Sequence, residues 1–314
     1  MEKRKLGNTD LWIAPIAFGG NVLGWTINEE ASFNILDAFS ENFNLVDTAD
    51  VYSRWKPENS GGESETIIGN WLKSRNNRDK VIIATKVGAD MGEGKSLKKN
   101  YIIKSAENSL KRLQTDYIDL YQTHYDDLDT PIEETLEAYD SLIKAGKIRW
   151  IGASNMSAER LKLSIETAKA NNLPVYQSFQ PEYNLYAREN FEHEFEKICL
   201  EHQIGVITYY SLASGFLTGK YRTEIDLHKS VRGQGIKKYL NDRGFKILAA
   251  LDQVSAAHNT QPAAVALAWL LSRPAVSAPI TSLTRLTQLP SLIDAANLKL
   301  SDGDISLLDM ASAY

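Results

Sequence analysis

The sequence predicts an α/β fold, a single (β/α)8 barrel that takes up the whole chain, residues 1–314. Eight short runs rich in apolar and β-branched residues recur along the chain, and their nearly continuous apolar character is typical of parallel strands covered on both faces. Longer stretches with helical periodicity separate these runs, which indicates consecutive β/α units. No Pro/Gly/Ser-rich linker marks a domain boundary.

The competing architecture is a doubly wound parallel sheet. Its dinucleotide-binding form carries G-x-G-x-x-G after the first strand. Here the first strand leads into GGNVLG, Gly19–Gly24, which does not fit that spacing. Eight units in a chain of this length instead fit a barrel of about 250 residues with added loops and helices.

The expected barrel strands share a core of Val, Ile, Leu and aromatic residues. They are Ile16–Gly20, Leu45–Ala49, Val81–Val87, Ile118–His124, Ile148–Asn155, Val175–Gln180, Gly205–Ser211 and Val276–Thr281. A short N-terminal hairpin is expected to precede them.

The helices between the strands show one apolar stripe each. They are expected at Glu29–Phe43, Glu63–Arg75, Lys99–Leu113, Pro131–Ala145 and Ala158–Asn171. Thr130 and Ser157 stand where N-caps belong, and Gly146 stands where a helix should end. The material beyond the basic barrel is expected to be the long loop Leu212–Phe245, a helix around Ala263–Leu271 and a C-terminal helix near Asp302–Ala313.

Composition narrows the class of protein. The chain is 43% hydrophobic and 24% charged, with a net charge of -5, which argues against a nucleic-acid partner. It shows neither an apolar stretch long enough to span a membrane nor a signal peptide. The single cysteine, Cys199, lies in a helical pattern, so we expect it in the core of a cytoplasmic protein.

Polar side chains gather at the predicted C-terminal ends of the strands, where barrel enzymes hold their active sites. Asp47 ends the second strand and Tyr52 follows in its loop, while Lys86 ends the third strand and His124 the fourth. Each residue alone also has a purely structural interpretation. Asp47 could cap a turn, and Tyr52 could be an aromatic side chain at the rim. Lys86 could be a surface lysine, and His124 could be a core histidine with its hydrogen bonds satisfied. Four ionisable side chains at one rim favour a shared catalytic site instead.

The chemistry of this set is coherent. Asp47 is the natural counter-ion for Lys86, because a buried ammonium without one would be costly. A retained positive charge beside Tyr52 is expected to lower the pKa of the phenol, so that it can give a proton to a carbonyl oxygen. His124 can orient that carbonyl. No metal-ligand cluster is apparent, and no metal is expected.

These motifs, in order, resemble the aldo-keto reductase family over essentially the whole chain, in a bacterial type related to the branch of the channel β subunits. DTADVY resembles the family's D-T-A-x-x-Y, and the motifs TK, QTHYDD, GKIRWIGASN and SLASGFLTGKYR follow in the family's order. The chain departs from the pattern at Ser53, where glycine is common, and at Tyr210-Ser211, where Ser-Pro is commoner.

The resemblance implies NADP(H) as cofactor, a small aldehyde or ketone as substrate, and the tetrad Asp47, Tyr52, Lys86 and His124. It implies that Ser154, Asn155 and Gln177 hold the nicotinamide carboxamide while Tyr209 stacks on the ring. The other expected cofactor contacts are Gly20, Asn21, Ser211, Leu212, Ser214, Lys220, Arg232, Ser282, Thr284, Arg285 and Gln288. The last four open a helix after the eighth strand, although Leu292 stands where many members have asparagine.

The substrate is expected to meet an aromatic pocket of Trp25, Trp55 and Tyr125. Two alternatives to an NADPH-dependent carbonyl reductase stay open. One is a nucleotide-sensing binding subunit without activity, but the channel β subunits that the chain resembles carry asparagine at the position of His124. The other is a Schiff-base lyase using Lys86, which needs a neutral lysine and is disfavoured by Asp47. The oligomeric state cannot be predicted from the sequence.

Overall fold

The strands of the chain form a closed barrel, as the sequence predicts. The structure, a computed structural model, describes residues 1–92 and 94–314, and within them eight parallel strands close in the order β10-β3-β4-β5-β6-β7-β8-β9. These strands are β3 (Ala17–Gly19), β4 (Leu45–Asp47), β5 (Ile82–Val87), β6 (Ile118–Thr123), β7 (Ile148–Ser154), β8 (Ser178–Gln180), β9 (Gly205–Thr208) and β10 (Val276–Thr281). A (β/α)8 barrel is thereby confirmed.

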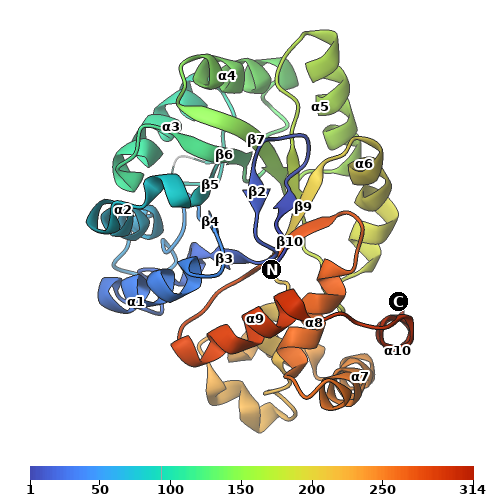
Figure 1. The fold of residues 1–314 in the computed structure, drawn as a ribbon. Helices are drawn as coiled ribbons and strands as arrows, with labels where there is room; N and C mark the ends of the chain where they lie inside the picture. Colours follow the sequence, from blue (N-terminus) through green and yellow to red (C-terminus); the bar gives the residue numbers. More distant parts are fainter. Residues whose placement is uncertain (93) are drawn as a thin grey trace.

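Helices surround the barrel, and Figure 1 shows α1 to α6 ringed round the strands. They are α1 (Glu29–Ser40), α2 (Glu63–Arg75), α3 (Lys99–Leu113), α4 (Ile132–Lys144), α5 (Ala158–Ala170) and α6 (Glu196–Glu201). Ser157 caps α5 as expected, since its side chain accepts a hydrogen bond from Arg160 N. The expected cap at Thr130 is wrong: α4 begins one residue later than predicted, and the Thr130 hydroxyl donates to Asp127 Oδ2 at 2.6 Å.

The C-terminal part of the chain adds helices α7 (Asp242–Ala257), α8 (Pro262–Leu271), α9 (Leu289–Asn297) and α10 (Asp302–Ala311). The sequence-based expectation that α8 is extra material is wrong, because α8 packs directly on β10 and its residues Ala264–Leu271 are all buried. Helix α7, which was not predicted, is the added element, and it packs outside α8 and against α10 (Figure 1).

The predicted hairpin consists of β1 (Arg4–Lys5) and β2 (Trp12–Ile13), which pair antiparallel. In Figure 1 it lies across the centre of the barrel. Apolar side chains of the hairpin and of the barrel interior form one cluster, made of Leu6, Leu11, Ile13, Ala17, Leu45, Ala84, Leu120, Ile207 and Ala278. The hairpin therefore closes the N-terminal end of the barrel, and only the opposite end is left to form a pocket.

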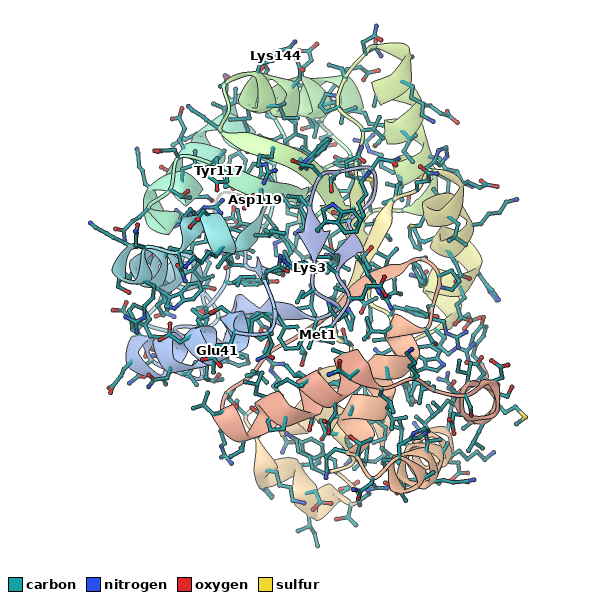
Figure 2. All side chains as sticks on the ribbon, in the orientation of Figure 1. Met1, Lys3, Glu41, Tyr117, Asp119 and Lys144 are labelled. Carbon is teal, nitrogen blue, oxygen red and sulfur yellow. The ribbon has the colours of Figure 1, made fainter. Side chains whose placement is uncertain are left out.

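Salt bridges stabilise the N-terminal end of the barrel, which the hairpin closes. Asp119, labelled in Figure 2 near the hairpin, is buried and accepts hydrogen bonds from Arg78 Nη2 at 2.7 Å and from Arg149 Nη1 at 2.6 Å. Arg149 also reaches Asp10 in the hairpin turn, at 2.7 Å. Polar groups at this end of a barrel serve stability rather than catalysis.

Cys199 lies in α6, and its side chain is buried, as expected. Burial raises the pKa of this thiol to about 12, which leaves it unreactive at neutral pH. Among the described residues, no helix combines the length and the apolar character that a bilayer crossing needs.

Candidate active site

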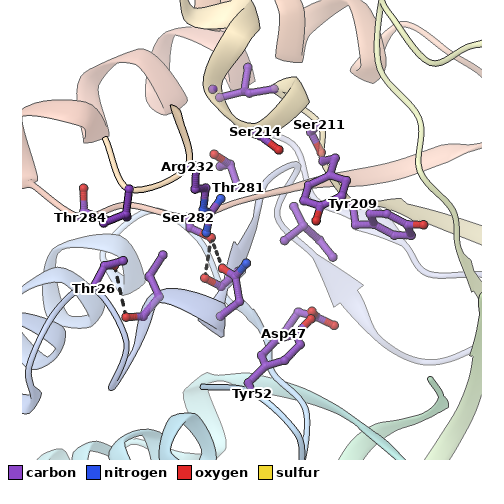
Figure 3. Close-up of a pocket in the computed structure, with 18 of the residues that line it drawn as sticks. Thr26, Asp47, Tyr52, Tyr209, Ser211, Ser214, Arg232, Thr281, Ser282 and Thr284 are labelled. Atoms are coloured by element: carbon purple, nitrogen blue, oxygen red, sulfur yellow. Dashed lines mark hydrogen bonds between the residues drawn. The ribbon is translucent and has the colours of Figure 1, made fainter. Parts of the chain in front are cut away.

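A large pocket opens at the C-terminal ends of the strands, with a volume of about 1280 Å³. Figure 3 shows Asp47 and Tyr52 at the lower edge of this pocket, with Arg232 above them. The pocket is lined by most of the residues predicted from the sequence: Asn21, Asp47, Tyr52, Trp55, His124, Tyr125, Ser154, Asn155, Tyr209, Ser211, Leu212, Ser214, Lys220, Arg232, Ser282, Thr284, Arg285 and Gln288. Lys86 lies beneath its floor and is fully buried.

The Lys86 ammonium is the centre of the polar cluster on this floor. Its Nζ donates to Asp47 Oδ2 at 2.6 Å, to the Thr48 carbonyl at 2.8 Å and to Tyr52 Oη at 2.9 Å. An ammonium has three donors, so all three hydrogen bonds are used within the protein. The lysine is thereby fixed against the phenol that faces the pocket.

The second oxygen of Asp47 is held by two glutamines that sequence reasoning missed. Gln122 Nε2 donates to Asp47 Oδ1 at 3.1 Å, and Gln180 Nε2 donates to the same oxygen at 3.0 Å. Gln122 lies on β6 two residues before His124, which directly follows the strand, so the alternation of a strand turns both side chains to the barrel interior. That spacing was the available signal for Gln122.

Burial decides the acidity of the Tyr52 phenol. It raises the pKa of Tyr52, and the nearby Lys86 charge only partly offsets this effect. The expectation that Lys86 lowers this pKa below its ordinary value is therefore wrong for the protein alone. Burial also works against the charge on Lys86, but the Asp47 carboxylate and the Tyr52 phenol outweigh it and raise the pKa of Lys86. The lysine is thus a stable cation beside a neutral phenol.

His124 is the second polar group that faces Tyr52. Burial lowers its pKa well below the ordinary value, and the charges of Lys86 and Lys95 add to this effect, so the imidazole is neutral. Its ring lies 5.9 Å from that of Tyr52 and is stacked on Tyr125 at 4.7 Å. Among the described residues, His124 Nδ1 has no hydrogen-bond partner. A neutral imidazole beside a phenol can orient a carbonyl oxygen between them.

The neighbouring rim carries side-chain amides and hydroxyls. Asn155 follows β7 with a φ of 46° and donates from Nδ2 to the His124 carbonyl at 2.9 Å. Tyr209 Oη donates to Asn155 Oδ1 at 3.1 Å, and Ser154 Oγ donates to the Gln180 carbonyl at 2.8 Å. These contacts fix the Asn155 amide and the Tyr209 ring next to the polar cluster on the pocket floor.

Two expected cofactor contacts are wrong. Gln177 lies before β8 at the closed end, where its Oε1 accepts a hydrogen bond from Asn8 N of the hairpin at 3.1 Å. Gln180, at the end of the same strand, is the glutamine that lines the pocket. Gly20 does not line the pocket but packs behind it, where a Cβ would come within 2.9 Å of the Asp47 carbonyl. Gly19 lines the pocket instead.

The long segment after β9 covers one side of the pocket with short helical turns at Ala213–Thr218, Glu224–Lys229 and Gly233–Tyr239. Arg232 from this segment lies with its guanidinium 5.2 Å from the ring of Trp25. Its Nη2 is buried and has no hydrogen-bond partner among the described residues. A buried guanidinium nitrogen without a partner indicates room for an anionic ligand.

The segment after β10 forms the adjoining side. Ser282 Oγ lies 2.7 Å from the Gly19 carbonyl and 2.8 Å from Asn21 Oδ1 (Figure 3). Gln288 Oε1 accepts from the backbone amides of Thr284 and Arg285, at 2.8 and 3.0 Å. Gln288 therefore shapes the turn before α9, and Arg285 in that turn lines the pocket.

An aromatic wall stands on the side of Tyr52. Trp55 lies 5.8 Å from Tyr52 and 5.5 Å from Trp25, between ring centroids. Trp55 lines the pocket, but the expectation that Trp25 lines it is wrong, because Trp25 packs against Trp55 with its ring under the Arg232 guanidinium. Among the described residues, no group of three or more His, Cys, Asp or Glu side chains is placed to hold a metal ion.

Comparison with known proteins assigns this arrangement to one family. The profile of the aldo/keto reductase family matches residues 15–313. The chain is 33% identical to the aldo-keto reductase YhdN of Bacillus subtilis over 295 residues, which cover 92% of this chain and 85% of that protein. It is 32% identical to the aldo-keto reductase AMT2 of Alternaria alternata over 340 residues, covering 98% of this chain and 90% of AMT2.

A third similar protein has a different description. It is a probable voltage-gated potassium channel subunit beta of Arabidopsis thaliana, 30% identical over 313 residues, which cover 95% of this chain and 92% of that protein.

Proposed function

Since the chain belongs to the aldo/keto reductase family, whose members are oxidoreductases that act on carbonyl compounds, we propose that it reduces aldehydes and ketones to alcohols with NADPH. The single observation that carries the proposal is the cluster on the pocket floor. Lys86 is fixed between Asp47 and Tyr52, and the Tyr52 phenol faces the pocket beside a neutral His124.

Each residue of the tetrad has one task in this proposal. A reduced nicotinamide supplies the hydride that the carbonyl carbon takes up. Tyr52 donates its phenolic proton to the oxygen, and Lys86 stabilises the phenolate that is left. Asp47 keeps Lys86 charged. His124 donates a hydrogen bond that orients the oxygen, which a neutral imidazole can do from one nitrogen. The step is reversible, with the same groups acting in the opposite direction.

The cofactor residues are proposed from the pocket lining. Ser154 and Asn155 lie where they can hold the carboxamide, and the Tyr209 ring can cover the nicotinamide face. Arg232, with its unpartnered buried nitrogen, and Lys220 fit the pyrophosphate. Arg285 projects next to the start of α9, where a planar guanidinium suits a 2′-phosphate. The proposed cofactor site is completed by the remaining lining residues Asn21, Ser211, Leu212, Ser214, Ser282 and Thr284. Gln288 holds the turn before α9.

Two observations argue against the alternatives. The Schiff-base lyase needs a neutral lysine, but the Asp47 carboxylate and the Tyr52 phenol raise the pKa of Lys86 despite its burial. A binding subunit without activity does not need a complete tetrad, whereas here all four residues meet at one pocket. We therefore retain the reductase, and we propose that it works as one domain of residues 1–314 in the cytoplasm, where the single buried Cys199 stays reduced.

The proposal is tested by loss of NADPH absorbance with a panel of aldehydes and ketones, including aromatic ones that fit the wall of Trp55 and Tyr125. We expect turnover with NADPH for several members of the panel. Tight NADPH binding with no turnover of any carbonyl would contradict the proposal and support the binding subunit.

A further inference from the structure

The ring of Tyr125 lies flat against the imidazole of His124, and the proposed mechanism gives this contact no task. His124 directly follows β6, Tyr125 comes next in the chain, and both residues line the pocket. Their rings are stacked, with 4.7 Å between the centroids and 27° between the planes. The stack forms beyond the end of the strand, since successive side chains within a strand point to opposite faces.

The backbone of His124 is fixed by two hydrogen bonds, which leave its ring free to turn. The His124 amide donates to the Val87 carbonyl at 2.8 Å, and the His124 carbonyl accepts from Asn155 Nδ2 at 2.9 Å. The last side-chain torsion of a histidine has broad energy minima, so the plane of the imidazole needs a further contact. Nδ1 of this ring is buried and has no hydrogen-bond partner among the described residues.

Ring contacts supply the restraint that these hydrogen bonds do not. The Tyr125 ring restrains the plane of the imidazole, and the Tyr52 ring meets the imidazole edge-on, at 74° and 5.9 Å between centroids. Tyr125 is itself restrained, because Lys95 Nζ lies 4.4 Å from its ring centroid in a cation–π contact. The imidazole is therefore packed between two tyrosine rings, and only one of them, Tyr52, belongs to the tetrad.

From this geometry we infer that Tyr125 is a positioning residue, whose ring holds the His124 imidazole at the angle at which it donates a hydrogen bond to the carbonyl oxygen beside Tyr52. This role rests on the proposed reductase function and adds to it a residue that acts through His124. Hydrogen bonds weaken steeply as their angle departs from linear. An imidazole that turns freely would orient the carbonyl poorly and lower kcat.

The competing interpretation is that Tyr125 only packs against the body of the substrate. Direct packing holds the bound substrate and the transition state alike, so its loss raises KM and leaves kcat unchanged. Its contribution also depends on the size of the aldehyde. A role through His124 acts on the orientation of the carbonyl itself, so its loss lowers kcat for short and long aldehydes alike.

The first test measures kcat and KM for propanal and benzaldehyde with NADPH saturating. Propanal is too short to fill the aromatic wall when its carbonyl is at Tyr52. Because an aromatic stack contributes modestly, Tyr125→Leu should lower kcat about fivefold for both aldehydes. Tyr125→Phe restores the ring and should recover the wild-type kcat to within about twofold.

Trp55→Leu is the matched control for the loss of an aromatic ring from this pocket. Trp55 lines the same pocket but lies against Tyr52, with 5.8 Å between the ring centroids. Its loss should mainly raise KM for benzaldehyde, as expected of a residue that packs directly on the substrate.

The second test asks whether Tyr125 acts through His124. In a His124→Asn background the imidazole is absent, so adding Tyr125→Leu should change kcat by no more than about twofold. The NMR spectrum of protein with 13C-labelled histidine checks the stack independently of turnover. The His124 signals, assigned by their absence from His124→Asn, should shift in Tyr125→Leu and stay close to the wild-type positions in Tyr125→Phe.

The outcomes separate the role of Tyr125 from the function on which it rests. A loss of kcat confined to benzaldehyde, an equal loss in the His124→Asn background, or unchanged His124 signals in Tyr125→Leu would overturn this role while carbonyl reduction continued. If the wild type reduced neither aldehyde, nor any carbonyl of the wider panel, the reductase proposal and the role of Tyr125 would both be overturned.

Discussion

Asp50, which lies between Asp47 and Tyr52 in the chain, is predicted to make the stability of the protein fall as the pH rises. Its side chain is 3% exposed, and its Oδ1 has no hydrogen-bond partner among the described residues. The fully buried Glu65 is a neighbour, and Arg112 Nε donates to Glu65 Oε2 at 2.7 Å. Burial and the Glu65 carboxylate raise the pKa of Asp50 to about 8, so the folded protein holds a proton there at neutral pH.

The sign and size of the effect follow from proton binding. An aspartate in the unfolded chain has a pKa of about 3.9 and has lost its proton above about pH 5. The folded state keeps its proton on Asp50 up to about pH 8, so the unfolded state binds fewer protons and stability falls with rising pH. The slope is about 1.4 kcal/mol per pH unit, or roughly 2 to 3 kcal/mol between about pH 6 and pH 8.

The substitution Asp50→Asn removes this titration while keeping the shape of the side chain. In urea unfolding, we expect the free energy of unfolding of the wild type to fall by this amount relative to that of Asp50→Asn over the same pH interval. Asp116→Asn, at an exposed acid, serves as the control and should keep the wild-type slope. Identical pH slopes in wild type and Asp50→Asn would refute the reasoning, because Asp50 would then be ionised in the folded protein.

Three further changes probe the site. Lys86→Met should lower the free energy of unfolding by about 3–5 kcal/mol in urea, because it leaves the buried Asp47 without a counter-ion. Adding Asp47→Asn to the Lys86→Met protein should restore part of this free energy. If it restores none, the ion pair between Lys86 and Asp47 does not account for the loss. His124→Asn should lower kcat with NADPH affinity unchanged, and loss of cofactor binding in fluorescence titration would assign His124 to structure. The wild type should bind NADPH about tenfold or more tightly than NADH, equivalent to about 1.4 kcal/mol. Arg285→Ala should reduce this preference, mainly by lowering the affinity for NADPH. Equal wild-type affinities for the two cofactors would contradict the assignment of Arg285 to the 2′-phosphate.

The barrel could be predicted because its strands are covered on both faces. Nearly continuous apolar runs such as Val81–Val87 differ from the amphipathic helices between them. The positions that we propose as catalytic followed from the same pattern, since parallel strands of a barrel end at one rim. Asp47, Lys86 and His124 could thus be assigned to one site before the structure was considered.

The errors arose where strand boundaries or three-dimensional burial decide the outcome. The sixth strand begins at Ser178, so Gln180 reaches the pocket and Gln177 stays at the closed end. The pKa of Tyr52 depends on burial from all sides, which opposes the neighbouring Lys86 charge. Helix α8 is apolar all round, and this pattern does not distinguish a helix of the barrel from an added one.

The central claim is that the pocket reduces a carbonyl by hydride uptake at carbon and proton transfer from Tyr52. The most direct measurement uses NADPH in which both hydrogens at C4 of the nicotinamide are deuterium, an aldehyde from the turnover panel, and mass spectrometry of the product. We predict an alcohol with one deuterium on the former carbonyl carbon from wild type, and a rate at least about 100-fold lower from Tyr52→Phe with cofactor affinity unchanged. An alcohol without deuterium, or equal rates in the two proteins, would contradict the claim.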